Sequence, residues 1–427
     1  MKSPPWLTPW RVACVIAGGA LGCSALAQPP SIRTPASAAA AVRAATEVRP
    51  TMAQALDAAW TRSLYAVEAR GRQTHAQAEL RVAEAWLAGA PTLELAQREG
   101  RGTAADGARE TDVGVALPLW RLGQRQQQKD AADAESAWAS AAERAARLRL
   151  AAQVRDLANQ LKRSEAEWQE AAQQRQLLDQ LSADVERRVK AGDLAPSDAM
   201  AAKADMLAAR VLEREAQQAY VAQRSAWTLL TGLAAAPETD EVRVQATAAT
   251  LDEHAEAQLA EAAVQRASHR LAQAQAQRGA PPELGIGLRQ ERPGLGQPRQ
   301  NSVALSLRMP FGTQTQSLPG LAAAMAEQDL AFAVQQRLRL QLEAELTLAQ
   351  GHLAASQAQA QAQQERVALL RERAQLLQKS FQAGESSLPE LLRALAAAGQ
   401  ASTAHARQQA VLGQAQARLH QALGQLP

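Results

Sequence analysis

The sequence is poor in aromatic residues. They make up 3% of the 427 residues, although 47% of the chain is hydrophobic, so the apolar content is mostly alanine and aliphatic side chains. A compact globular core of this size normally uses more phenylalanine and tyrosine to fill its volume. Alanine-rich sequence with regularly spaced leucine and valine instead favours long helices that pack closely.

Cysteine is absent after the first 27 residues, where both Cys14 and Cys23 lie. This stretch has a basic start, an apolar run and an A-x-A sequence at 25–27, which is typical of a secretory signal peptide cleaved after Ala27. Cleavage there leaves a mature chain without disulfides. A second interpretation stays open, because residues 20–23 weakly resemble a lipoprotein box with a lipid attached to Cys23.

Long apolar segments and one-signed charge are also missing. No segment of the mature chain has about 18 consecutive apolar residues, so no transmembrane helix is predicted, and an exported chain of this kind can span a membrane only with strands. The 46 basic and 43 acidic residues give a net charge of +3 and are interspersed, as on solvated helix faces. No basic cluster is interleaved with aromatics, which argues against nucleic-acid binding.

Prolines and glycines recur at one fixed interval. Three pairs are each separated by 192 residues: Pro118 and Pro310, Gly192 and Gly384, and Gly232 and Gly424. This interval is far longer than the roughly 20–50 residues of a solenoid repeat. It indicates duplication of one half-molecule.

The predicted organisation follows from this interval. A signal peptide is expected at 1–27 and a flexible leader rich in proline, alanine and serine at 28–50. The first repeat is expected at 51–232, a connector at 233–250 and the second repeat at 251–427. Each repeat contains a helix, a β-hairpin (92–118 or 283–310) and a long helical hairpin that turns near 192 or 384.

The two hairpins alternate with a period of two, one face apolar and the other small or polar. Strands of about eight residues come close to the nine to eleven that a tilted membrane strand needs, and the alternation is typical of an outer-membrane barrel. The predicted lipid-facing residues are Leu93, Leu95, Val113, Val115, Leu117, Leu284, Ile286, Leu288, Val303, Leu305, Leu307 and Met309. Four strands cannot close a barrel, so three chains are expected to supply twelve.

Long helices are predicted around the hairpins. Residues 124–189 contain no glycine or proline, and a helix of this length is on the order of 95 Å long. Leucines and valines recur at intervals of three and four, which favours coiled-coil packing. Further helices are predicted at about 51–89, 197–230, 251–278, 321–381 and 388–423. Because these helices are too polar for lipid, we expect them in the periplasm.

An alternative remains. Long alanine-rich helices with two hairpins are also compatible with a periplasmic coiled-coil adaptor or scaffold protein that has no membrane barrel. An adaptor, however, normally carries substantial β-rich domains beside a single helical hairpin, and this chain has too few strands for that.

The sequence resembles the TolC-type outer-membrane efflux proteins from about Thr51 to Gly424. The motifs are ALPLW at 116–120, LRMPFG at 307–312, and the turns AGDLAPSD at 191–198 and AGESSLPE at 383–390. The resemblance implies a mainly α fold with a small β part: a trimeric twelve-stranded barrel in the outer membrane, continued by an α-helical barrel in the periplasm. It also implies a passive exit duct that docks onto a periplasmic adaptor coupled to an inner-membrane pump.

In such tunnels the helical turns form the mouth that faces the adaptor. The matching residues here are Arg188, Gly192, Asp193, Leu194, Gly384, Glu385 and Leu388. Family channels narrow this mouth with charged or apolar rings. Four nearby residues are candidates for such a ring, although solvated helix charge is the preferred explanation for each: Asp184, Glu186, Glu372 and Arg373.

Catalytic, cofactor and metal signatures are not found in the sequence. The six histidines are scattered without metal-ligand spacing, and no phosphate-binding glycine loop or nucleophile elbow occurs. We therefore expect no enzyme activity and no cofactor. Metal cations, drugs and polypeptides all remain open as cargo, and the compact ends favour metal ions or small molecules.

Overall fold

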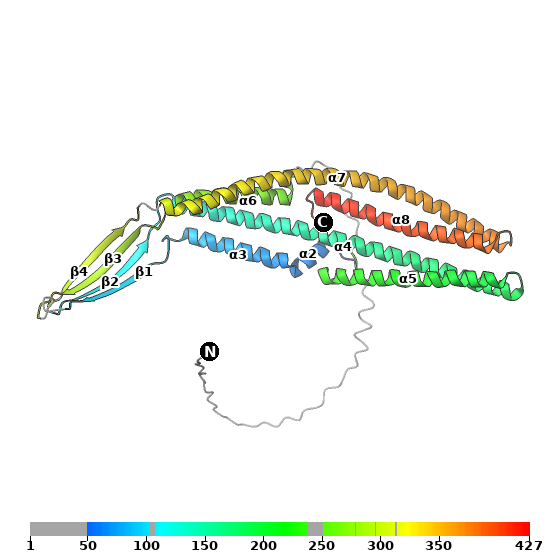
Figure 1. The fold of residues 1–427 in the computed structure, drawn as a ribbon, viewed down its shortest axis with the longest axis horizontal. Helices are drawn as coiled ribbons and strands as arrows, with labels where there is room; N and C mark the ends of the chain where they lie inside the picture. Colours follow the sequence, from blue (N-terminus) through cyan, green and yellow to red (C-terminus); the bar gives the residue numbers. More distant parts are fainter. Residues whose placement is uncertain (1–48, 102–106, 238–250, 278, 295, 312–313) are drawn as a thin grey trace, which may run out of the picture. The chain divides into compact units, whose positions relative to one another are not determined.

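The chain forms long α-helices and one small antiparallel sheet in a computed structural model (Figure 1). The structure describes residues 49–427 apart from 102–106, 238–250, 278, 295 and 312–313. The predicted signal peptide, the leader up to residue 48 and the connector from 238 onward lie outside the described residues.

The order helix, strand pair, long helix pair occurs twice. The first set is α2 (Met52–Arg62), α3 (Leu64–Glu84), β1 (Thr92–Glu99), β2 (Arg109–Pro118), α4 (Gln124–Ala191) and α5 (Pro196–Thr231). The second set is the 3₁₀ turn η1 (Leu251–Glu253), α6 (Ala255–Ala276), β3 (Glu283–Arg292), β4 (Gln300–Arg308), α7 (Gln314–Gln382) and α8 (Leu388–Ala422).

The four strands form one sheet in the order β1-β2-β3-β4, with every neighbouring pair antiparallel (Figure 1). The two hairpins are therefore joined through β2 and β3, which come from different repeats. In the register, Val115 of β2 lies between Leu93 of β1 and Ile286 of β3. Chain segments almost 200 residues apart in sequence thus share one apolar face.

The helices pack through small buried side chains. Helix α4 contacts α2, α3, α5, α6 and α8, and α7 contacts α6 and α8. Of the 21 buried residues of α4, ten are alanines, which allows neighbouring helices to approach closely. Larger side chains fill two clusters. One joins α2, α4 and α5 around Val154 and Trp227, and the other joins α4, α5, α7 and α8 around Val185 and Leu391.

Three boundaries differ from the sequence predictions. The first predicted helix is two helices, because Ser63 has an extended backbone and its hydroxyl caps α3 by accepting from the Ala66 N–H at 3.2 Å. Helix α7 begins at Gln314, before the predicted start at Leu321, and contains Pro319. Strand β4 ends at Arg308, so the prediction that Met309 is a strand residue is wrong. In the register of β3 and β4, Met309 would lie opposite Pro282, which has no backbone N–H to continue the ladder.

The two helical turns have the same cap. Gly192 (φ 90°) and Gly384 (φ 81°) both have left-handed backbones. The Asp193 N–H donates to the Arg188 carbonyl at 2.9 Å, and the Glu385 N–H donates to the Ser380 carbonyl at 2.9 Å. Each bond closes the end of a long helix in the Schellman arrangement. The bond partners are also separated by 192 residues, so the interval found in the sequence marks equivalent structure.

We predict that alanine has opposite effects at two glycines. Gly192→Ala places a Cβ in a left-handed cap and lowers the free energy of unfolding by about 1 kcal/mol. Gly351→Ala, inside α7 with open space around its Cα, raises it by about 0.5–1 kcal/mol. Denaturant unfolding of the detergent-solubilised protein, followed by circular dichroism, measures both. Shifts in the same direction would contradict the assigned cap.

Candidate functional site

One face of the sheet is apolar across all four strands. The register places the predicted lipid-facing residues in three rows: Leu95–Val113–Leu288–Val303, Leu93–Val115–Ile286–Leu305, and Leu117–Leu284–Leu307. Leu93, Leu95, Val303 and Leu305 are 74–75% exposed. The rows thus form a continuous apolar surface that the described part of the chain leaves largely uncovered.

The opposite face carries small side chains and charges. In two of its rows every residue except Glu94 has a small side chain: Glu94–Gly114–Gly287–Ala304 and Thr92–Ala116–Gly285–Ser306. Nearer the hairpin ends, Arg289 lies 2.8 Å from Asp112 and 2.8 Å from Glu110. Sequence reasoning missed these ion pairs, because alternation assigns a residue to a face but does not identify the residue beside it on the next strand.

Both edges of the sheet are open. Within the described residues, β1 pairs only with β2, and β4 pairs only with β3. Each outer edge therefore presents backbone N–H and C=O groups that a further strand could bind.

Hydrogen bonds to backbone carbonyls at the end of α3 hold the segment after β2 and the start of α4. The Trp120 indole N–H donates to the Ala85 carbonyl at 3.0 Å, and the Arg125 guanidinium donates to the Glu84 carbonyl at 2.7 Å. Three exposed apolar side chains lie close in sequence to the ends of strands β1, β2 and β4: Trp86, Leu122 and Phe311. Aromatic and apolar side chains at this level are typical of a membrane–water interface.

The predicted tip residues divide into two groups. Gly192, Asp193, Gly384 and Glu385 are exposed, whereas Leu194 is half-buried. Leu388 is only 2% exposed and belongs to the cluster that joins the two helical hairpins. We therefore correct the prediction for Leu388: its side chain supports the tip from inside and is not presented to a partner.

Arg188 also acts within the chain. Its guanidinium donates to Asp184 at 3.1 Å and to the Phe381 carbonyl at 3.3 Å, and it lies 5.1 Å from the centre of the Phe381 ring. The side chain thus links α4 to α7 at the tips. Of the four ring candidates, Asp184 is engaged in ion pairs with Arg187 and Arg188, whereas Glu186, Glu372 and Arg373 are exposed.

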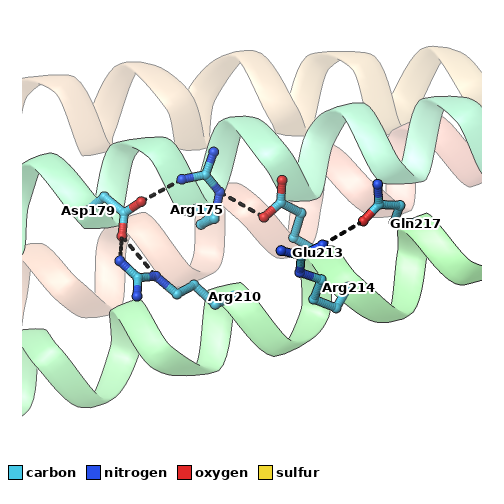
Figure 2. Close-up of polar contacts among 6 residues, drawn as sticks. All are labelled: Arg175, Asp179, Arg210, Glu213, Arg214 and Gln217. Carbon is cyan, nitrogen blue, oxygen red and sulfur yellow. Dashed lines mark hydrogen bonds and ion pairs between the residues drawn. The ribbon is translucent and has the colours of Figure 1, made fainter.

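A charged seam joins the helices of the first hairpin (Figure 2). Arg175 of α4 contacts Asp179 of the same helix at 2.5 Å and Glu213 of α5 at 2.7 Å, and Asp179 also contacts Arg210 of α5 at 3.0 Å. These pairs alternate in sign between the two helices. They fix the register of α4 against α5, since a shift by one turn would bring like charges together.

In the second hairpin, a hydrogen bond takes the place of the Asp179–Arg210 ion pair. Arg371 and Ser402 follow Asp179 and Arg210 by 192 residues, and the Arg371 guanidinium donates to the Ser402 hydroxyl at 3.0 Å. Arg371 also pairs with Glu170 of α4 at 3.1 Å. The second hairpin therefore uses its arginine to bind the first hairpin as well as its own partner helix.

An ion pair also holds α8 to α4. Glu167 contacts Arg407 of α8 at 2.7 Å and Arg163 at 3.1 Å. Burial of the Glu167 carboxyl favours its neutral form, but the hydrogen bonds and charges of Arg407 and Arg163 outweigh this effect and hold the pKa of Glu167 below its ordinary value.

Two classes of feature are not found in the described part of the chain. Its histidine, cysteine and acidic side chains form no group of three or more that could hold a metal ion. None of its helices combines the length and the apolar character needed to cross a bilayer.

Comparison with known proteins gives structural neighbours only. No protein-family model matches the sequence, and no curated protein matches it. Among solved structures, the chain is similar to the outer membrane protein VceC of Vibrio cholerae (TM-score 0.69, 19% identity, covering 88% of this chain and 96% of that one).

Two solved channels give similar values. The CmeC outer membrane channel of Campylobacter jejuni has a TM-score of 0.69 at 14% identity, covering 87% of this chain and 85% of that one. The open-state MtrE outer membrane channel of Neisseria gonorrhoeae has a TM-score of 0.68 at 17% identity, covering 88% of this chain and 89% of that one. The chain therefore has the fold of these channels, and the fold class predicted from the sequence is confirmed.

We predict that the Glu167 ion pairs make stability depend on pH. Because the pKa of Glu167 is lowered in the folded state, its contribution is complete above the ordinary glutamate pKa of about 4.3 and is lost as the pH falls through the lowered value. Glu167→Gln should therefore reduce the thermal midpoint at pH 7 but have little effect once the pH lies below the lowered pKa of Glu167. Glu186→Gln, an exposed control on the same helix, should change little at either pH. A Glu167→Gln effect that does not vary with pH would contradict the assignment.

Proposed function

We propose that this chain is the outer-membrane channel of a tripartite efflux system and works as a homotrimer whose twelve strands close one transmembrane barrel. The apolar face of the sheet carries this proposal, because it runs in three rows across four strands that end in two open edges. In lipid, every backbone polar group needs a partner. Three copies that place β1 beside β4 of the next copy supply those partners.

Exposed apolar side chains on the helices support the trimer. Helices α5 and α7 carry many that other parts of the chain leave uncovered, among them Leu207, Val211, Leu229, Leu330, Leu340 and Leu348. Neighbouring copies would bury these side chains in an α-helical barrel. In this arrangement the barrel lies in the outer membrane of a Gram-negative bacterium, and the helices extend into the periplasm.

The alternative, a periplasmic coiled-coil adaptor or scaffold, fits the sheet less well. A soluble hairpin pair would be expected to bury its apolar face against protein. Instead, Leu93, Leu95, Val303 and Leu305 are about three-quarters exposed. The channel therefore explains the exposed face, whereas the scaffold leaves it without a function.

We further propose that the exposed tips dock onto a periplasmic adaptor that couples the channel to an inner-membrane transporter. Asp193 and Glu385 occupy equivalent positions just after the two capping glycines, and both are exposed. Three copies would present six acidic groups at the inner mouth. The cargo passes passively through the duct.

Arginine should have opposite consequences on the two faces of β4. Leu305→Arg places a charge in lipid, at a cost of about 2–4 kcal/mol per chain near the membrane centre, and should abolish assembly in the outer membrane. Ser302→Arg, on the polar face of the same strand, should assemble normally. Cell fractionation and native gel electrophoresis measure both variants. Equal assembly of the two would overturn the proposed lipid face.

Charge reversal at the tips should uncouple the channel without dissociating it. Asp193→Lys combined with Glu385→Lys should weaken co-purification with the adaptor and lower resistance in a sensitised strain, because charges at an interface guide association. Glu215→Lys, an exposed reversal farther along α5, is the matched control. Unchanged efflux with a normal trimer would remove these residues from the docking surface.

A further inference from the structure

Glu94 is the only charged residue in the two small-residue rows of the polar face. Its row continues with Gly114, Gly287 and Ala304, and the row below it holds Thr92, Ala116, Gly285 and Ser306. The register pairs Gly114 with Gly287, so neither of these positions presents a side chain beside Glu94. Side chains in this band are thus too short to cover the Glu94 carboxylate, which is exposed.

Most other carboxylates of the polar face have a cationic partner. Arg289 pairs with Glu110 and Asp112, at 2.8 Å each, and Arg98 lies 3.4 Å from Glu110. At the other end of the strands, Arg308 pairs with Glu283 at 3.1 Å.

Among the described residues, only Glu94 and Glu291 on this face have no ion pair. The two differ in their surroundings. Glu291 lies in the row of Arg98 and Glu110, beside the hairpin ends, where other charges dominate. Glu94 lies farther along the strand, next to residues that carry no charge.

We propose that Glu94 makes the channel selective for cations, an inference that rests on the proposed trimeric barrel with its polar face toward the lumen. Three copies would place three carboxylates at one level of the wall, separated by glycine and alanine. A ring of carboxylates in a confined pore attracts cations and repels anions. The favoured permeant class at this level is small inorganic and organic cations.

The neighbouring copy does not supply an obvious counter-charge. Strand β1 is an edge strand, so in the barrel it lies beside β4 of the next copy. The polar face of β4 carries Gln300, Ser302, Ala304, Ser306 and Arg308. Arg308 is its only charge, and Glu283 already binds it. The Glu94 carboxylate therefore remains available to ions in the lumen.

The test is the reversal potential of the purified full-length protein in planar lipid bilayers under a KCl gradient. Glu94→Gln keeps the shape of the side chain and removes its charge, and it should lower the K⁺/Cl⁻ permeability ratio by about two-fold or more. Glu94→Lys should lower the ratio further. The control is Glu99→Gln, the same change on the same strand but on the opposite face, and it should leave the ratio near the wild-type value.

The outcomes separate the two proposals. Wild-type protein that inserts but forms no channels would reject the proposed function, and the selectivity proposal with it. Channels of normal conductance whose selectivity is the same in wild type and Glu94→Gln would reject the role of Glu94 and leave the channel intact. An equal loss of selectivity in Glu94→Gln and Glu99→Gln would also reject it, because the effect would then follow net charge and not the lumen face. Native gels of each variant confirm that the same oligomer is measured.

Discussion

The unpaired edges of β1 and β4 are the constraint on which the rest of the proposed assembly depends. A lone four-stranded sheet can bury neither its apolar face nor its edge backbone groups. In lipid, an unsatisfied backbone group costs several kcal/mol, so a spanning sheet must close. Closure with copies of the same chain satisfies both requirements at once. It also forces the helices that follow the strands to stand side by side.

The helices show how a duplicated chain can become asymmetric without losing its geometry. The caps at Gly192 and Gly384 have the same hydrogen bonds, and Asp179 with Arg210 is matched in position by Arg371 with Ser402. The first pair stays within its own hairpin, whereas Arg371 also reaches Glu170 in the other repeat. Backbone positions have been kept, and the charges have diverged so that one hairpin binds the other.

Much of the fold could be predicted from the sequence because it follows local periods. Alternation located all four strands, and the absence of glycine and proline delimited α4 closely. Contacts between distant segments could not be predicted in this way. The pairing of β2 with β3 and the partners of Arg289 depend on register across repeats. Leu388 lies close to the tip in sequence, but the first turn of α8 directs its side chain into the core. At Ser63, a local cap replaces a helical bond that periodicity alone would have kept.

The most direct test of the central claim is disulfide trapping between edge strands. Both native cysteines precede residue 28, so a cysteine replacing Leu95 in β1 can be combined in turn with one replacing Asn301, Val303 or Leu305 in β4. Within one chain these strands are separated by β2 and β3, or by about 14 Å, which is too far for a disulfide. We predict oxidised ladders of two and three chains, and no larger species, for at least one pair in outer-membrane fractions. Monomers alone for every pair would contradict the closed trimeric barrel.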